Sequence, residues 1–243
     1  MTKIAIIIPA RYASTRLQGK PLLKVNGKPI IQWVYERAMQ SKFADCVIVA
    51  TDDRRIFKAV NSFGGEAQMT LAKHQSGSDR IAEIVYKRSE FNIVVNVQGD
   101  EPLISPESID MAVETLISDE SADMSTLVRE ITDKTEILNP NLVKTVIAND
   151  GKALYFSRAA IPYEREEGVA KYYAHIGLYV YRREALLKMT KLKQTDLEKA
   201  ECLEQLRALQ NGFVIKTVKV DYKPLGIDTP EDFEEFKQKV SNS

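Results

Sequence analysis

Uninterrupted runs of branched apolar residues mark the first half of the chain, and segments of helical periodicity separate them. The first run, residues 4–8, has no polar alternation, which is typical of a strand buried on both faces of a parallel sheet. Pro9 is expected to end this strand because a missing amide would break a central ladder. Residues 45–50 and 92–97 have the same character and predict two more buried strands.

Between these strands the apolar residues recur at the spacing of amphipathic helices. Predicted helices cover residues 29–40 and 56–63, two more begin at Ser76 and Ser105, and a short strand covers residues 67–70. Ser76 with Asp79 fits a capping box, and Ser105 with Pro106 fits an N-cap followed by a first-turn proline. The alternation predicts an α/β fold, a Rossmann-like, doubly wound and mostly parallel sheet flanked by helices.

The alternation of strands and helices ends near Met124, and shorter strand-like segments follow. Residues 143–148, 153–156 and 176–181 read as strands, whereas residues 157–174 have no clean period. Asp150 and Gly151 predict a turn between the first two of these strands. We expect a smaller antiparallel subregion that folds over the ligand crevice and pairs with a second copy of the chain. A helix over 197–209, a strand over 214–220 and a last helix capped at Thr229 are predicted to complete a single domain, residues 1–243.

Composition excludes several classes of protein. The chain has 34 Lys plus Arg and 34 Asp plus Glu, so no overall field favours nucleic acid or a membrane surface. No apolar run approaches the roughly 20 residues of a membrane span, and the first strand leaves no room for a signal peptide. Cys46 and Cys202 lie in apolar patterns and are expected to be buried, reduced thiols. These observations predict a cytoplasmic protein that binds neither nucleic acid nor membranes.

The loop that follows the first strand carries the first candidate chemistry. Open α/β sheets bind their ligands outside the carboxyl ends of the strands, and this loop holds Arg11, Arg16, Gly19 and Lys20. Three cations there indicate a polyanion, most simply a nucleoside triphosphate, although surface loops are often cationic without any ligand. The loop has neither the GxxxxGK[ST] of a P-loop nor the GxGxxG of a dinucleotide site.

Two aspartates are candidates for a metal site. Asp100 follows the strand at residues 92–97, at the sheet edge where the cationic loop is expected, and Mg²⁺ binds through few carboxylates plus substrate oxygens. A turn aspartate is the alternative for Asp100. Asp228 precedes a helix start, where acids complement the helix dipole, so its position alone is equally well explained by capping. Asp52 also ends a strand and is interpreted as structural.

Several segments together resemble a known family. PARYASTRLQGKPL is similar to the signature of the sugar nucleotidyltransferases that make CMP-activated acidic sugars, most of all the 3-deoxy-manno-octulosonate cytidylyltransferase (CMP-Kdo synthetase) family. Gln18 stands where the family pattern has proline, a change that touches no charged position. The resemblance continues in order through HQSGSDR, NVQGDEP, ALYFSRAAIP, HIGLYVY, ECLEQLRAL and GIDTPED, and so covers nearly the whole chain.

The resemblance assigns roles to individual residues. It implies that Asp100 and Asp228 bind Mg²⁺ and that Arg11 and Lys20 neutralise the triphosphate, so Asp100, Lys20 and Arg11 are the expected catalytic residues. The residues expected to contact the nucleotide are Ala10, Arg11, Lys20, Ser78, Arg80 and Gln98. Those expected to bind the sugar acid are Arg158, His175, Tyr179 and Gln205, each of which also has an ordinary structural explanation. Residues up to about 125 would form the nucleotide-binding half, and residues 126–243 the sugar-binding and dimerisation half.

The implied reaction transfers CMP from CTP to the anomeric hydroxyl of 3-deoxy-D-manno-octulosonate (Kdo), giving CMP-Kdo and pyrophosphate for lipopolysaccharide biosynthesis. In this reading the protein is a Mg²⁺-dependent homodimer, and catalysis needs positioning and charge neutralisation rather than a protein nucleophile. Alternatives within the class are 8-amino-Kdo, sialic acid or pseudaminic acid as the sugar. Outside the class, a nicotinamide-dependent oxidoreductase and a non-catalytic nucleotide-binding module remain open.

Overall fold

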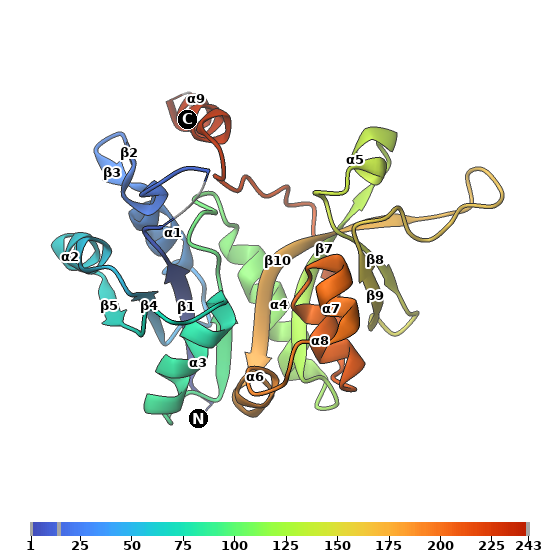
Figure 1. Ribbon diagram of the computed structural model, residues 1–243, viewed down its shortest axis with the longest axis horizontal. Coiled ribbons are helices and arrows are strands. Elements are labelled where there is room, and N and C mark those ends of the chain that lie inside the picture. Colours follow the sequence, from blue (N-terminus) through green and yellow to red (C-terminus); the bar gives the residue numbers. More distant parts are fainter. Residues whose placement is uncertain (1, 14–15, 242–243) are drawn as a thin grey trace. The chain divides into compact units, whose positions relative to one another are not determined.

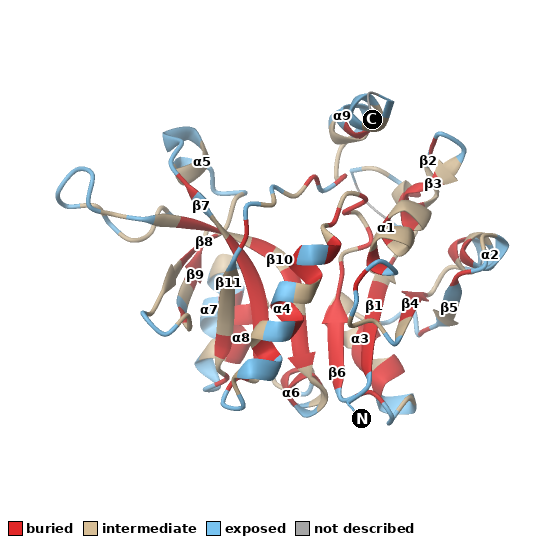
Figure 2. Ribbon diagram, turned by 180° about the vertical axis from the view of Figure 1, so that it is seen from behind, coloured by how far each residue is buried: buried red, intermediate tan, exposed pale blue. Residues whose placement is uncertain are grey.

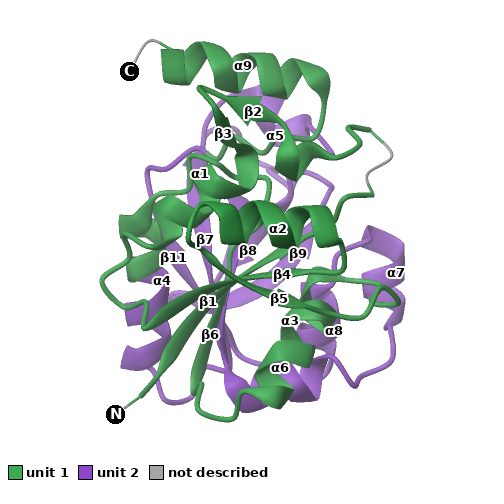
Figure 3. Ribbon diagram, turned by 90° about the vertical axis from the view of Figure 1, so that its left-hand side faces the viewer, with its two compact units in different colours: residues 1–110, 224–243 green, residues 111–223 purple. Residues whose placement is uncertain are grey.

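The computed structural model describes residues 2–13 and 16–241, which form two compact units (Figure 3). Unit 1 consists of residues 1–110 and 224–243, and unit 2 of residues 111–223. Thr15 and its neighbour Ser14, both in the cationic loop, lie outside the described residues. The assignment of the whole chain to one domain stays a prediction.

The sheet of unit 1 is parallel and buried, as the apolar runs predict. Its strands are β1 (Ile4–Ala10), β4 (Cys46–Thr51), β5 (Glu66–Met69) and β6 (Ile93–Asn96), in the order β6-β1-β4-β5 (Figure 1). Every pair is parallel, with Ile7 opposite Ile48 on one side and opposite Asn96 on the other. Figure 2 shows β1 and β6 as buried along nearly their whole length, which explains why neither strand has polar alternation.

The order of these strands contains a reversal that creates a ligand position. The chain passes from β1 through α1 (Ile30–Ala38) to β4, and through α2 (Arg54–Ser62) to β5. It then returns through α3 (Gly77–Lys87) to β6, on the other side of β1. Since such crossovers are right-handed, α1 and α2 cover one face of the sheet and α3 the other. The carboxyl ends of β1 and β6 therefore flank a topological switch point, where open α/β sheets bind ligands.

The predicted end of the first strand at Pro9 is wrong. β1 continues to Ala10, with Pro9 opposite Ala50 of β4. A Cβ on Gly99 would lie 2.8 Å from the carbonyl oxygen of Pro9, so this carbonyl faces the β6 side. The nitrogen of Pro9 faces the same side, where β6 has already ended opposite Ile7, so no ladder bond is lost.

The end of the chain belongs to unit 1. After residue 224 it leads to α9 (Pro230–Ser241), which packs on a short hairpin formed by β2 (Lys24–Val25) and β3 (Lys28–Pro29). Asn26 and Gly27 make the hairpin turn with φ of 50° and 79°, the left-handed values that such two-residue loops require. The shared apolar cluster consists of Val25, Ile30, Leu225, Ile227 and Phe236.

Unit 2 contains the predicted antiparallel subregion. β10 (Tyr172–Arg182) pairs antiparallel with β7 (Met124–Ile131) and with β8 (Lys144–Ile147). β9 (Ala153–Ser157) pairs with β8, and β11 (Ile215–Lys219) pairs parallel with β7. Three of these strands match predicted segments closely, whereas β7 was not predicted and β10 begins four residues earlier than expected.

The helices of unit 2 correct two expectations. Unit 2 contains α5 (Lys134–Leu138) and α6 (Arg183–Met189). The single helix predicted over 197–209 is in fact two helices, α7 (Asp196–Glu201) and α8 (Gln205–Gln210). The break lies at Cys202, which has φ 53° and ends α7 in the left-handed conformation. Cys202 is consequently exposed rather than buried, and Cys46 is half-buried. α4 (Pro106–Ser118) contains the boundary between the units, and no helix in the described ranges is long and apolar enough to cross a membrane.

Candidate active site

Two carboxylates of unit 1 converge on one ammonium group. Nζ of Lys20 donates to Oδ2 of Asp100 at 2.5 Å and to Oδ1 of Asp228 at 2.9 Å. Nη2 of Arg16 reaches the other oxygen of Asp228 at 2.8 Å. Burial opposes the charge of Lys20, but the two carboxylates, Asp100 first, outweigh it and raise the pKa of the ammonium group. Lys20 is therefore a cation held between two anions.

Backbone contacts bring the two aspartates together. Asp100 lies in the loop after β6, and its carbonyl oxygen accepts a hydrogen bond from the amide of Ile227 at 2.9 Å. Ile227 is fully buried in the cluster that holds α9, so its position is fixed by packing. Oδ2 of Asp232 accepts from the amides of Asp228 and Thr229 at 2.9 and 2.8 Å and caps α9 from within its first turn.

A cavity of about 410 Å³ opens beside this cluster, at the switch point of the unit 1 sheet. The end of β1 and the loop after β6 form two of its walls, and the start of α3 lies at a third. The residues around it are Pro9, Ala10, Arg11, Ala13, Arg16, Lys20, Pro21, Gly77, Gln98, Gly99 and Asp100. The site residues predicted from the opening loop and from QGDEP thus share one cavity that is lined by cations.

Ser78 and Arg80 follow Gly77 in α3 but are not part of the cavity lining. Both are buried, and Arg80 donates to the hydroxyl of Thr70 and lies 3.4 Å from Asp52. Burial lowers the pKa of Arg80. The carboxylate of Asp52 raises this pKa in part, and the neighbouring charge of Arg11 lowers it further. Nε of Arg80 and Nη2 of Arg11 are buried without a hydrogen-bond partner among the described residues. These two guanidinium groups therefore keep donors for an anion or a base.

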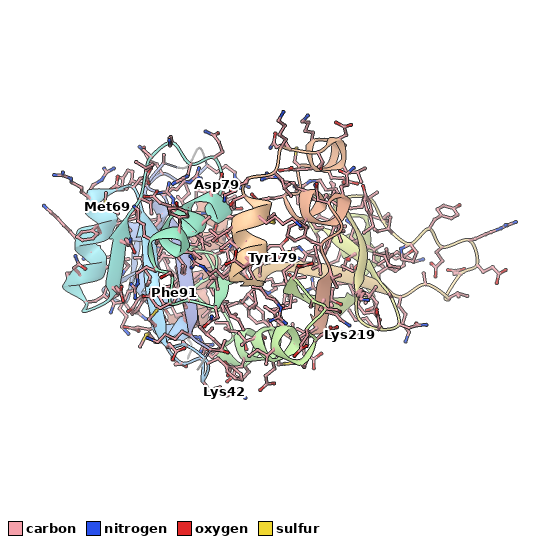
Figure 4. The ribbon with its side chains drawn as sticks, turned by 90° about the horizontal axis from the view of Figure 1, so that it is seen from below. Lys42, Met69, Asp79, Phe91, Tyr179 and Lys219 are labelled. Atoms are coloured by element: carbon pink, nitrogen blue, oxygen red, sulfur yellow. The ribbon has the colours of Figure 1, made fainter. Side chains whose placement is uncertain are left out.

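In unit 2 the predicted sugar-site aromatics are neighbours on β10. The rings of His175 and Tyr179 lie 5.3 Å apart, and Phe156 of β9 packs against His175 at 5.0 Å (Figure 4 labels Tyr179). Nε2 of His175 lies 3.0 Å from the hydroxyl of Thr126. Burial lowers the pKa of His175 to about 3, so its imidazole is neutral near pH 7. Burial also raises the pKa of Tyr179 well above its usual value.

Arg158 is held in place by backbone carbonyls. Its Nε donates to the carbonyl oxygen of Glu201 at 2.7 Å and its Nη1 to that of Pro140 at 3.1 Å. The Glu201 carboxylate accepts from the amide of Arg158 at 2.9 Å and from the hydroxyl of Ser157 at 2.6 Å. Since Nε is engaged, the guanidinium of Arg158 can bind a carboxylate through its Nη1–Nη2 edge and not through the Nε side.

A buried lysine supports the same backbone. Lys144 is fully buried, and its Nζ donates to the carbonyl oxygens of Asn139, Leu142 and Arg158 at 2.8, 2.6 and 2.8 Å. Burial lowers its pKa, and the nearby charge of Arg158 acts in the same direction. In α8, Nε2 of Gln205 is buried without a partner among the described residues, so this predicted site residue also keeps a free donor.

Comparisons with known proteins show the family to which the chain belongs. The cytidylyltransferase family model matches residues 5–220. The chain belongs to the cytidylyltransferase family. A 3-deoxy-manno-octulosonate cytidylyltransferase of Geobacter metallireducens is 47% identical over 250 residues, with 98% of each chain covered. One of Syntrophotalea carbinolica is 50% identical over 238 residues, covering 94% of this chain and 95% of its own. The solved structure of CMP:2-keto-3-deoxy-manno-octonic acid synthetase complexed with CTP superposes with a TM-score of 0.95 at 43% identity, covering 99% of each chain.

The cytidylyltransferase fold confirms the predicted fold class, and the site fits a divalent cation. One ammonium group touches both Asp100 and Asp228, which shows that their oxygens can meet on a single cation. Two carboxylates leave most positions around Mg²⁺ to phosphate oxygens and water, as in many nucleotide sites. Within the described ranges, no three His, Cys, Asp or Glu side chains gather as a complete protein-only metal site.

Two residues around Arg158 in unit 2 were missed by sequence reasoning. Glu201 and Lys144 fix Arg158, yet neither lies in a recognisable pattern of its own. Glu201 stands directly before Cys202 in the ECLEQLRAL segment, so that segment contained a signal that was assigned to Gln205 alone. Lys144 reads as an ordinary polar residue at the start of a strand, and only its burial distinguishes it.

Proposed function

We propose that this protein transfers CMP from CTP to the anomeric hydroxyl of Kdo and releases pyrophosphate, giving CMP-Kdo for lipopolysaccharide biosynthesis. The observation that carries the proposal is the convergence of Asp100 and Asp228 on one cation, beside a cationic cavity at the switch point of the sheet. The family and its full-length relatives support CTP as the donor and Kdo as the acceptor.

Asp100 and Asp228 would hold Mg²⁺. When bound, the ion supplies orientation to the attacking sugar oxygen and stabilises charge on the α-phosphate. Lys20 and Arg11 reach the cavity from the loop after β1 and neutralise the leaving pyrophosphate. No covalent intermediate on the protein is needed, because positioning and charge neutralisation suffice for an in-line transfer.

The remaining nucleotide residues determine orientation. Ala10 and Gln98 line the cavity directly, and Gly77 at the start of α3 brings the amides of a helix N-terminus to its wall. Arg80 offers a buried Nε that has no hydrogen-bond partner among the described residues, and Ser78 precedes it by two positions on α3. We assign to these residues the recognition of the cytidine and the phosphate nearest to it.

The sugar acid is assigned to unit 2. The Nη1–Nη2 edge of Arg158 binds its carboxylate, because backbone carbonyls already orient the guanidinium group. His175 stays neutral, so its ring and the hydroxyl of Tyr179 act as hydrogen-bonding groups rather than as charges. Nε2 of Gln205, which has no hydrogen-bond partner in the described part of the chain, donates to a sugar hydroxyl.

Assembly and location belong to the same proposal. We assign the protein to the cytoplasm, where CTP is available, and to a homodimer formed through unit 2. The segment between β9 and β10 extends away from the strands of unit 2 and exposes Tyr163 by 89% and Val169 by 72% (Figure 1). Leu138 on the nearby α5 is 72% exposed, and apolar surface of this kind suits an interface between two copies. Light scattering after gel filtration measures the expected mass of two chains.

Pyrophosphate release tests the reaction directly. Purified protein is incubated with CTP, Mg²⁺ and Kdo, and parallel wells contain ATP, GTP or UTP and the acids 8-amino-Kdo, sialic acid and pseudaminic acid. Release that needs both CTP and Kdo is expected. Release with CTP and a different acid would retain the chemistry and reassign the residues of unit 2. Absence of release from every pairing, in a folded protein, would reject the enzyme.

A further inference from the structure

Lys20 has two roles that cannot be performed at the same time. Its ammonium lies between Asp100 and Asp228, at 2.5 and 2.9 Å, and its side chain is only 15% exposed. The proposed function needs the same two carboxylates for a divalent cation and the same ammonium for the triphosphate. A metal ion and the ammonium group cannot both occupy the point between the carboxylates, since like charges repel there strongly.

We infer that Lys20 is an internal counter-ion that makes metal binding depend on the nucleotide. Its ammonium neutralises Asp100 and Asp228 until a triphosphate enters the cavity, and then transfers to the phosphate oxygens. The divalent cation takes the position that Lys20 leaves. This inference rests on the proposed function, because it takes the metal site and the triphosphate site from there.

The surroundings of Lys20 support such an exchange. Lys20 begins a short 3-10 helix, η1 (Lys20–Leu22), whose N-cap Gly19 has φ 69°, and Pro21 is buried, so the backbone under the side chain is anchored. The flexible four-carbon stem allows the ammonium to move while the backbone stays. Both Asp100 and Lys20 line the cavity, so the ammonium needs to cross no wall to reach a bound phosphate.

A second cation, Arg16, also contacts Asp228 but competes with a metal ion only weakly. Its side chain is 64% exposed, and a solvated pair of this kind contributes little. Lys20 is therefore the main competitor of a metal ion. In the terms of linkage, a triphosphate that draws Lys20 away raises the affinity for the cation, and the cation raises the affinity for the triphosphate by the same factor.

Mn²⁺ binding in the absence of nucleotide tests the inference without any activity measurement. The signal of free Mn²⁺ in electron paramagnetic resonance gives its affinity for the wild-type protein and for Lys20→Met. We expect Lys20→Met to bind Mn²⁺ more tightly by about tenfold or more, the factor typical of removing one competing hydrogen bond to a charged group. Lys20→Arg keeps the charge and is expected to bind Mn²⁺ as weakly as the wild type.

Two further variants complete the design. Lys24→Met removes a charge from an exposed residue of unit 1 and is expected to leave Mn²⁺ affinity unchanged. Mg²⁺ alone should raise the melting temperature of Lys20→Met more than that of the wild type, since Asp100 and Asp228 then have no cation between them to reduce their mutual repulsion. Lys20→Gln serves for both measurements if Lys20→Met does not fold.

The outcomes separate the counter-ion from the metal site. If Asp100→Asn weakens Mn²⁺ binding but Lys20→Met binds no tighter than the wild type, the metal site stands and the counter-ion role is overturned. If Asp100→Asn changes Mn²⁺ binding neither alone nor combined with Lys20→Met, the metal assignment of the proposed function fails, and the counter-ion fails with it. Tighter binding in Lys20→Met that is lost in the double variant supports both.

Discussion

The amide of Ile227 donates a 2.9 Å hydrogen bond to the carbonyl oxygen of Asp100. This single contact sets the next residue, Asp228, beside Asp100, although the two aspartates lie in different chain segments of unit 1 and all of unit 2 separates them in the sequence. The packing of Ile227 and Phe236 in one apolar cluster fixes the contact. The chemistry proposed for the site therefore depends on the apolar packing of the C-terminal segment as much as on the charged residues.

Asp100→Asn is expected to lower kcat by about a hundredfold or more, the scale on which one charge-stabilising group acts in a transition state. The variant should fold normally, because the backbone carbonyl that binds Ile227 is unchanged. Pyrophosphate release and circular dichroism measure the two effects. Asp221→Asn, the same substitution at an exposed residue, is the control. Wild-type turnover of Asp100→Asn at saturating Mg²⁺ would remove Asp100 from the metal site.

Gly99→Ala is expected to displace the loop that carries Asp100. The new Cβ would lie 2.8 Å from the carbonyl oxygen of Pro9, closer than such atoms approach, and the backbone of β1 cannot yield easily. We expect at least a tenfold loss of kcat/KM, in line with the sensitivity of catalysis to small misplacements. Gly226→Ala is the matched control, since a Cβ there meets nothing within 4 Å. Equal kinetics of the two variants would contradict a rigid contact between this loop and β1.

Arg158→Ala is expected mainly to raise the KM for the sugar acid, by about tenfold or more, as loss of a charged hydrogen bond does. Glu201→Gln should raise the same KM less, because the carbonyl of residue 201 still accepts from Nε. Steady-state kinetics at saturating CTP separate KM from kcat. Lys193→Ala, which removes a cation at an exposed residue of unit 2, should behave as the wild type. An unchanged KM in Arg158→Ala would show that the sugar pocket is misplaced.

Acid is expected to destabilise the protein through His175. Burial places the folded-state pKa of His175 at about 3, below the ordinary 6.5, so the unfolded chain binds the extra proton. This contribution to stability is complete above about pH 6.5 and is lost as the pH falls towards 3. One proton gives a slope of at most about 1.4 kcal/mol per pH unit, and the half-buried position of His175 reduces it.

Urea unfolding between pH 7.5 and pH 5 measures this slope. His175→Gln should show a shallower decline in the free energy of unfolding than the wild type. Tyr179→Phe alters the neighbouring side chain but keeps the imidazole, and is expected to retain the wild-type slope. Parallel declines in all three proteins would mean that other groups bind the proton.

The sequence alone predicts unit 1 better than unit 2, for a physical reason. Buried parallel strands such as β1 and β6 consist almost entirely of apolar residues, and caps such as Ser76 with Asp79 are local. β7 was missed although its first five residues are buried, because Ser125 and Thr126 interrupt the apolar run. Their hydroxyls are satisfied by the carbonyl oxygens of Ala112 and Leu178, and these contacts are made only in the folded chain.

The sequence likewise predicts only part of the candidate site. Residue types and segments identify Asp100, Lys20 and Arg158, because charge at a strand end or in a loop is visible in the sequence. The partners of these residues are not visible. The break at Cys202 presents the carbonyl of Glu201 to Arg158, and it depends on a left-handed residue that apolar periodicity cannot reveal. Likewise, nothing in the sequence places Lys20 between two aspartates.

The return of the chain to unit 1 has a consequence for biosynthesis. A ribosome that has completed residues 1–110 has synthesised every strand of the unit 1 sheet, but not Asp228 or the cluster residues Ile227 and Phe236. All of unit 2 must be translated before these residues emerge. A nascent chain can thus build the nucleotide cavity early, yet it gains the second carboxylate only near the end of synthesis. Translation itself then delays the moment at which the chain can consume CTP.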